Sequence, residues 1–187
     1  MTKPLPTLED WQLMRDTFTQ VVDSTKQWDD PVPPTMGYSY SLEKGIPVPP
    51  PYYPKFSQGK GRGLFASRDI KKHELVHDGD QSDVVFPNAL AWRRFVFSLP
   101  RDFACDSTDW FWTQQHVIYG PYFIHTGMDI SVLMNSGGKE YGPGSAPNVM
   151  PESGISGKFY ALRDIEKGEE MLTDYDAYST KLKGLGL

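Results

Sequence analysis

Two copies of one nine-residue frame, far apart in the chain, constrain this sequence most. The first copy runs from Ala66 to Glu74 and the second from Ala161 to Glu169, and both read Ala-x-Arg-Asp-Ile-x-Lys-x-Glu. In each copy a charged turn separates two apolar stretches, a pattern that predicts strand, turn and strand. The copies begin about 95 positions apart, far more than an ordinary hairpin connection, so they predict two separate units.

Length and composition narrow the class of protein. The 187 residues suit one domain with a short extension, and a 39% hydrophobic, 13% aromatic composition is enough for a core. No apolar run approaches the roughly 20 residues that span a bilayer, and the N-terminus lacks the apolar segment of a secretory signal. We therefore expect an intracellular protein, in the nucleus or the cytoplasm, without a membrane partner.

The net charge and the cysteine content argue against further classes of protein and of site. Cys105 is the only cysteine, which rules out an intrachain disulfide and cysteine-zinc clusters. A net charge of −5 argues against direct nucleic-acid binding. An acidic surface would suit a basic peptide, although the same charge is ordinary for a protein of this size.

Hydrophobic spacing predicts two helices within a mostly β chain. Apolar residues at intervals of three and four favour a helix over residues 7–28, and Asn88 can cap a second helix that reaches Phe97 and ends before Pro100. Other stretches are expected as a Pro-rich strap or SH3 ligand (31–54), short strands and turns (56–86), an aromatic-rich core strand or peptide groove (103–124), a Gly-rich loop (136–146) and strand-turn-strand (157–175).

The Gly-rich segment 59–63, Gly-Lys-Gly-Arg-Gly, admits a ligand close to the backbone because no Cβ intrudes. It does not fit the common phosphate-binding motifs. A Walker motif needs Ser or Thr after the lysine, a dinucleotide fingerprint opens a helix, and a kinase loop needs partner motifs that are absent here. A simple tight turn is the alternative interpretation.

Four motifs in order resemble the SET-domain protein lysine methyltransferases. They are the segment 59–65 with the first frame behind it, Asn135-Ser136, Pro147-Asn148, and the second frame ending in Thr173-Asp174-Tyr175. The resemblance covers about residues 58–178. It implies a mostly β, β-clip-like fold of small sheets with short helices and a knot-like threading of the C-terminal strand, which would bring together Tyr175, Asn135 and Gly61.

The resemblance also implies a domain division. It places an N-terminal helix and Pro-rich strap at 1–57, the SET domain at 58–178 with a variable insert at about 87–123, and a short tail at 179–187.

By the same resemblance the cofactor is S-adenosylmethionine, released as S-adenosylhomocysteine, and no metal is required. The cofactor contacts it implies are Lys60, Gly61, Arg62, Asn135, Ser136 and Tyr175. Tyr175 matches the catalytic tyrosine, whose phenol oxygen would orient the lysine amine towards the methyl group. Two features depart from the family: Ser136 stands at the usual histidine, and the loop to Pro147 is several residues longer.

The substrate channel is assigned to Thr173, Tyr178 and Tyr122. Thr173 falls where many relatives carry Phe or Tyr, so its smaller side chain suggests room for di- or trimethylation. A second family tyrosine would fall near Gly127-Met128, where there is none, and Tyr119 and Tyr122 are the alternatives.

The resemblance implies a protein lysine N-methyltransferase that acts on a histone tail as a chromatin regulator. Two alternatives stay open: an inactive SET fold that binds a peptide or partner, and a methyltransferase for a non-histone protein. A homodimer that closes the lysine channel is a further option. Asp102, Asp106 and Asp109 could attract a basic substrate or simply be solvated.

Overall fold

The computed structural model describes residues 3–25, 50–86, 88–115, 122–138, 145–152 and 157–177. Its helices are α1 (Leu8–Thr25), α2 (Gly79–Ser82), α3 (Ala89–Ser98) and α4 (Arg101–Ser107), with the 3-10 turns η1 (Thr108–Trp110), η2 (Ile130–Leu133) and η4 (Tyr175–Ala177). Its strands are β1 (Tyr52–Ser57), β2 (Gly61–Ala66), β3 (Leu75–Asp78), β4 (Asp83–Phe86), β5 (Phe111–Gln115), β6 (Tyr122–Gly127), β7 (Asn135–Ser136), β8 (Val149–Pro151), β9 (Lys158–Ala161) and β10 (Glu170–Thr173).

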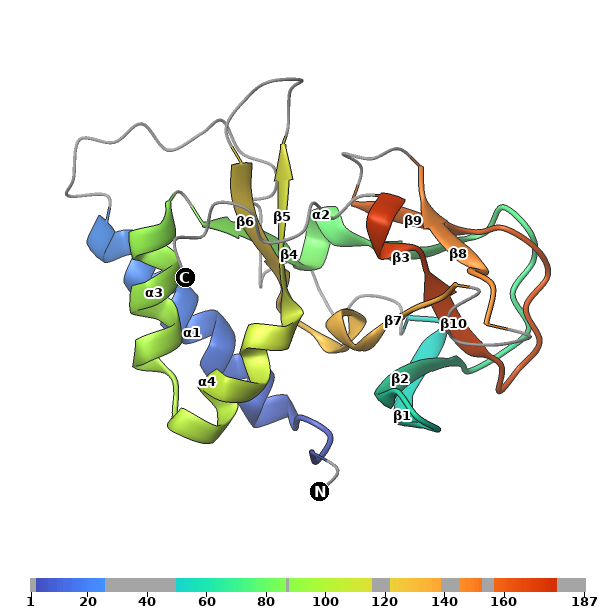
Figure 1. The fold of residues 1–187 in the computed structure, drawn as a ribbon, viewed down its shortest axis with the longest axis horizontal. Helices are drawn as coiled ribbons and strands as arrows, with labels where there is room; N and C mark the ends of the chain where they lie inside the picture. Colours follow the sequence, from blue (N-terminus) through green and yellow to red (C-terminus); the bar gives the residue numbers. More distant parts are fainter. Residues whose placement is uncertain are drawn as a thin grey trace.

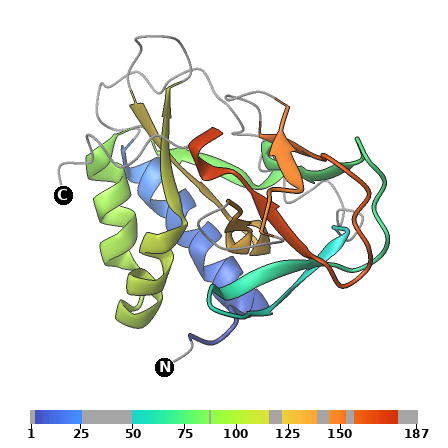
Figure 2. The same cartoon turned by 45° about the vertical axis from the view of Figure 1, so that its right-hand side comes forward.

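The described strands form three small sheets. Their orders are β1-β2-β10-β7, β3-β9-β8 and β4-β6-β5, and only the β10–β7 pair is parallel. Helices α1, α3 and α4 gather on one side and the first two sheets on the other, with the β4-β6-β5 sheet between (Figures 1 and 2). This confirms the prediction of small sheets with few short helices; the knot-like threading stays a prediction.

The two copies of the repeated frame pack against each other. Ile70 and Ile165, both buried, form an antiparallel bridge with two backbone hydrogen bonds of 2.9 Å. The same frame position, His73 in one copy and Gly168 in the other, has a positive φ of 68° and 85°. Each of these two residues donates its backbone N–H at 2.8 Å to the alanine that opens the other copy. The repeat is therefore a pseudo-symmetric pair of turns that joins the first sheet to the second.

Helix α1 begins as predicted and covers the core with one face. Thr7 and Asp10 exchange hydrogen bonds of 2.8 and 3.2 Å at its start, which satisfies backbone N–H groups there. Its Trp11 ring lies 5.2 Å from that of Trp110, and Phe18 packs edge-on against Phe86. The predicted last turn, beyond residue 25, lies outside the described residues.

Helix α3 agrees with the prediction, whereas the aromatic segment does not. Asn88 caps α3 by accepting a hydrogen bond of 2.9 Å from Ala91 N. The stretch expected as strand from 103 onward is helical as far as residue 110, in α4 and η1, and becomes strand only in β5. Phe103 and Trp110 pack together at 5.6 Å along this helical stretch. Aromatic residues fit strands and helices alike when one face is buried, which explains the error.

Strand β1 forms from the end of the Pro-rich stretch, which was expected to be an extended strap. Its residues pair in register with β2, from Tyr52 opposite Ala66 to Ser57 opposite Gly61. Pro54 is tolerated because β1 is an edge strand of its sheet. The rest of the strap, 31–49, and the tail, 179–187, lie outside the described residues, and the domain boundaries stay predictions.

No helix in the described part of the chain is long and apolar enough to cross a membrane.

Candidate functional site

A cavity of about 500 Å³, called here the large cavity, opens where the β1–β2 turn, β7 and the residues after β10 meet. It is lined by Lys3, Lys60, Gly61, Arg62, Asp109, Trp110, Val132, Leu133, Asn135 and Tyr175. Five of the predicted site residues, from three distant segments, therefore come together at one cavity.

Two glycines of the β1–β2 hairpin bear on the large cavity: Gly61 lines it, and Gly63 lies against Asn135, which lines it. Gly61 has a φ of 78°, and a Cβ built there would meet nothing within 4 Å. A side chain is therefore excluded by backbone conformation and not by space. At Gly63 a side chain is excluded by lack of space, because a Cβ would lie 2.6 Å from Glu170 Oε1 and 2.9 Å from Asn135 Nδ2.

The amide of Asn135 is held in a fixed orientation. Its Nδ2 donates to the Arg62 carbonyl at 2.9 Å and to Glu170 Oε1 at 3.0 Å, while Ser57 Oγ donates to Glu170 Oε2 at 2.8 Å. Both amide hydrogens are thus used within the protein. The amide oxygen of Asn135 accepts no hydrogen bond from the described residues, so it remains able to accept one from a ligand.

Asn148 fixes the strand that leads to Tyr175. It is 1% exposed; its Nδ2 donates to the Glu170 carbonyl at 2.8 Å, and its Oδ1 accepts from Leu172 N at 2.8 Å. Its backbone N–H donates to the Leu172 carbonyl at 2.9 Å. The Pro147-Asn148 pair therefore has a clear structural role, which is to tie β10 in place.

Arg62 closes the floor of the large cavity with an internal ion pair. Its guanidinium donates to both oxygens of Asp106, at 2.6 and 2.5 Å, and to the Pro4 carbonyl at 3.0 Å, and it lies 5.4 Å from the Trp110 ring. Lys3 Nζ adds contacts to Asp106 at 3.1 Å and Asp109 at 2.9 Å. Burial alone would raise the pKa of Asp106, but the hydrogen bonds from Arg62 and Lys3 outweigh it and lower that pKa. Asp106 and Asp109 therefore already have cationic partners.

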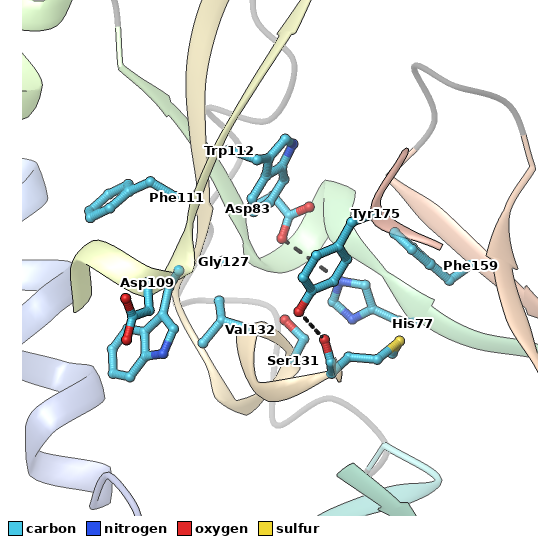
Figure 3. A pocket seen from close by; sticks show the side chains of 12 residues that line it. His77, Asp83, Asp109, Phe111, Trp112, Gly127, Ser131, Val132, Phe159 and Tyr175 are labelled. Atoms are coloured by element: carbon cyan, nitrogen blue, oxygen red, sulfur yellow. Dashed lines mark hydrogen bonds and ion pairs between the residues drawn. The ribbon is translucent and has the colours of Figure 1, made fainter. Parts of the chain in front are cut away.

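Tyr175 stands at the junction of two cavities. Its hydroxyl donates to the Met134 carbonyl at 2.6 Å, and the residue is 41% exposed. It lines the large cavity on one side and a second cavity on the other. Figure 3 shows its ring at the centre of that second cavity, with a dashed line marking the hydrogen bond from its hydroxyl.

The second cavity, called here the aromatic pocket, has a volume of about 110 Å³. Its lining is mostly aromatic and apolar, with one imidazole and two carboxylates (Figure 3). The residues are His77, Asp83, Asp109, Trp110, Phe111, Trp112, Gly127, Ser131, Val132, Met134, Phe159 and Tyr175. Such a pocket suits an apolar stem that ends in a cation, because aromatic faces and a carboxylate both attract positive charge.

Three of the predicted site residues lie away from both cavities. Ser136 pairs with Thr173 in the parallel β7–β10 ladder, and its Oγ donates to the Gly137 carbonyl at 3.4 Å. Thr173 is 1% exposed, and its Oγ1 has no hydrogen-bond partner among the described residues. Tyr122 is exposed at the start of β6. None of these three lines either cavity, and Tyr178, like the alternative Tyr119, lies outside the described residues.

Several site residues were not predicted from the sequence. Lys3 reaches the large cavity from the N-terminal segment, Glu170 orients Asn135, and His77 and Asp83 line the aromatic pocket. The glutamate carried a weak signal, because it directly follows the second repeated frame. Within the described ranges, no three acidic, His or Cys side chains gather as metal ligands would.

Comparison with solved structures gives distant matches. One is a Plasmodium falciparum protein provisionally assigned as a histone methyltransferase, with 20% identity, 68% of this chain and 95% of that chain covered, and a TM-score of 0.41. Another is the Chaetomium thermophilum polycomb repressive complex 2, with 20% identity, 73% and 16% covered, and a TM-score of 0.45. A third is the ctPRC2 structure bound to S-adenosylmethionine, with 19% identity, 69% and 16% covered, and a TM-score of 0.41. The chain thus spans about a sixth of the length of these PRC2 chains.

A search of curated proteins gives no significant match. The family model for the SET domain, in contrast, matches residues 61–176, which is more than half of the chain and contains all but two of the residues lining the large cavity. The chain therefore belongs to the SET-domain family.

Proposed function

We propose that this protein is an S-adenosylmethionine-dependent protein lysine N-methyltransferase and that a histone tail is its substrate. The observation that carries the proposal is the position of Tyr175, whose side chain lines both the large cavity and the aromatic pocket. A methyl donor in the first and a lysine in the second would meet at its hydroxyl. Membership of the SET-domain family supports this reaction class.

The residues of the large cavity fit the cofactor. Its volume of about 500 Å³ lies in the usual range of roughly 300–1,000 Å³ for small-molecule sites. Lys60 places a positive charge on its wall, and Lys3 lines it as well but pairs with Asp106 and Asp109. The amide oxygen of Asn135 can accept from an ammonium group. When bound there, S-adenosylmethionine would supply an electrophilic methyl group.

Tyr175 and the Met134 carbonyl would organise the reacting amine. The phenol oxygen and the carbonyl are 2.6 Å apart, so an amine near them finds two oxygen acceptors that fix the direction of its lone pair. Carbonyl oxygens next to a positively polarised methyl group also add weak C–H···O contacts. Both groups act by orientation and need no change in their own covalent structure.

The aromatic pocket is the place we assign to the lysine side chain. A free lysine has a pKa of about 10.4, and its amine must be neutral to accept a methyl group. Apolar and aromatic walls such as Phe111, Trp112 and Phe159 lower the pKa of an amine by removing water. We assign the lysine to this pocket because two of the three residues predicted for the channel, Thr173 and Tyr122, line neither cavity, while the third, Tyr178, lies outside the described residues.

The number of methyl groups transferred follows from the sequence resemblance alone. Thr173 stands where many relatives carry Phe or Tyr, which predicts di- or trimethyl-lysine as the product, whereas in the structure Thr173 is 1% exposed and lines neither cavity. Mass spectrometry of the product checks this, and a product that stops at monomethyl-lysine would contradict it.

The test of the proposed function is methyl transfer from labelled S-adenosylmethionine to a core-histone mixture, with the modified residue identified by mass spectrometry. We expect label on histone lysine. Calorimetric titration of the cofactor into the same sample separates the alternatives. Binding without transfer would favour a non-histone substrate, and absence of binding would favour an inactive peptide-binding module, for which the serine at position 136 is the motivating feature.

A further inference from the structure

Asp83 presents a buried carboxylate to the aromatic pocket. It is the first residue of β4, and its side chain is 16% exposed. Two glycines leave it room: a Cβ at Gly79 would lie 2.2 Å from its Oδ2, and a Cβ at Gly127 would lie 3.3 Å from its Oδ1. Backbone from two neighbouring elements thus makes space for this one carboxylate.

The partly buried carboxylate of Asp83 accepts few hydrogen bonds from the described residues. Its Oδ1 accepts a hydrogen bond from Ser82 Oγ at 3.2 Å and lies 3.7 Å from His77 Nε2, which is within ion-pair distance but beyond hydrogen-bond distance. Its Oδ2 accepts nothing from the described residues. An ionised carboxylate has about four acceptor sites and is costly to bury unless it is paired. Asp83 can therefore accept further hydrogen bonds from a cationic donor in the pocket.

Other titratable groups lie near Asp83 and His77. His77 Nδ1 lies 3.1 Å from the Tyr52 hydroxyl, Asp129 acts on both residues, and Asp78 acts on His77. Burial raises the pKa of the Asp83 carboxyl, with the nearby imidazole only partly offsetting this. Burial alone would lower the pKa of His77, but the carboxylates, Asp83 above all, outweigh it and raise that pKa.

The size of the pocket selects the shape of the cation. Its volume of about 110 Å³ is smaller than the roughly 150 Å³ cavity that holds a benzene ring. A slim linear amine fits such a space. Tyr175, Trp112 and Phe159 line it together with Asp83, so a lysine side chain here has aromatic faces along its stem and a carboxylate for its head (Figure 3).

We propose that Asp83 binds the ammonium of the substrate lysine in the aromatic pocket and takes its proton before methyl transfer, an inference that rests on the proposed function. An N–H bond of the ammonium breaks and an O–H bond forms on Asp83. The electron pair stays on nitrogen, where it is available to the methyl group. Ser82 Oγ, which lies 3.2 Å from Asp83 Oδ1 and 3.5 Å from His77 Nε2, gives the proton a route onward when His77 is in its neutral form.

The amine site is tested without any need for turnover. The probe is n-butylammonium chloride, which carries the lysine side chain's four methylenes and charged head, titrated at about pH 7 while the indole and imidazole signals are followed by NMR. We expect saturable binding to the wild-type protein. Asp83→Asn should weaken it by about tenfold or more, because the charge that pairs with the ammonium is gone. Asp16→Asn is the control, because Asp16 is exposed on α1 and lines neither cavity; its effect should stay below about threefold.

A second comparison needs no variant, and so does not depend on whether Asp83→Asn folds. The neutral isostere n-butanol should bind the wild-type protein about tenfold or more weakly than n-butylammonium. Equal affinities for the two probes, or an Asp83→Asn protein that binds the ammonium as well as wild type does, would overturn the proposal.

The third measurement is the rate of methyl transfer, which distinguishes a failure of the role assigned to Asp83 from a failure of the proposed function. With S-adenosylmethionine and core histones, Asp83→Asn should lower kcat by about 10²–10⁴-fold and move the rising limb of the pH–rate profile to higher pH. An unchanged profile would overturn the role of Asp83 in proton transfer. If the wild-type protein binds n-butylammonium through Asp83 but transfers no methyl group to any lysine, the amine site holds and the proposed function is wrong.

Discussion

Asn148 ties strand β10 to the rest of the protein, and the cost of removing its side chain follows from its contacts. The residue is 1% exposed, and its amide satisfies the Leu172 N–H and the Glu170 carbonyl at 2.8 Å each. In Asn148→Ala both backbone groups lose their side-chain partner inside the protein. Each such loss costs about 1–3 kcal/mol, so we predict a decrease of about 2–6 kcal/mol in the free energy of unfolding. The third contact, to Glu169 at 3.1 Å, adds little because Glu169 also pairs with Arg163.

Urea unfolding followed by circular dichroism measures this change as a lower midpoint at constant slope. Asn88→Ala is the matched control, because the side chain of Asn88 makes one hydrogen bond among the described residues, the α3 cap at 2.9 Å. Loss of a cap costs about 1 kcal/mol. If Asn148→Ala were no more damaging than Asn88→Ala, the claim that Asn148 anchors β10 would be refuted.

Two further predictions concern the large cavity. Gly63→Ala should weaken S-adenosylmethionine binding by about tenfold or more. The new Cβ would lie 2.6 Å from Glu170 Oε1 and 2.9 Å from Asn135 Nδ2, so both side chains would have to move, at a cost typical of overpacking. A calorimetric affinity within error of wild type would contradict this prediction. The lowered pKa of Asp106 means that its stabilising contribution is complete above the ordinary carboxyl pKa of about 3.9 and is lost as pH falls below it. The free energy of unfolding, measured in urea at about pH 6 and again at about pH 3.5, should therefore fall more in the wild-type protein than in Asp106→Asn. Equal decreases in the two proteins would argue against the Arg62–Asp106 pair as a stabilising contact.

The repeated frame shows what local sequence can predict in this chain. Its alternation of apolar stretches and charged turns correctly predicted strands on both sides of each turn, since those signals depend on neighbouring residues. That the two turns bond to each other through Ile70 and Ile165 depends on tertiary structure and was not expected. The cap of α3 was also predictable, because Asn88 acts on a residue only three positions away.

The errors have physical causes. Aromatic residues at 103–110 were read as strand, yet Phe103 and Trp110 bury their rings from a helical stretch. Pro54 argued against a strand, but an edge position needs no N–H from it.

Some residues of the candidate site could be predicted from local motifs, and others are brought together only by the fold. Lys60, Gly61, Arg62, Asn135 and Tyr175 belong to short motifs, and these five line one cavity. His77 and Asp83 are six positions apart in no recognisable spacing and come together only because β3, α2 and β4 fold around Gly79. Lys3 likewise reaches its place through an ion pair with residues more than 100 positions away.

The measurement that tests the account most directly is the rate of methyl transfer to core histones by Tyr175→Phe, read together with its affinity for S-adenosylmethionine. Loss of the hydroxyl that bonds to the Met134 carbonyl should reduce the rate by about 100-fold or more, since orientation of the amine is lost, while the cofactor affinity stays close to wild type. Tyr53→Phe, on the exposed side of β1, controls for loss of a tyrosine hydroxyl as such. A Tyr175→Phe protein that transfers methyl groups at the wild-type rate would contradict the assignment of the reaction to this junction.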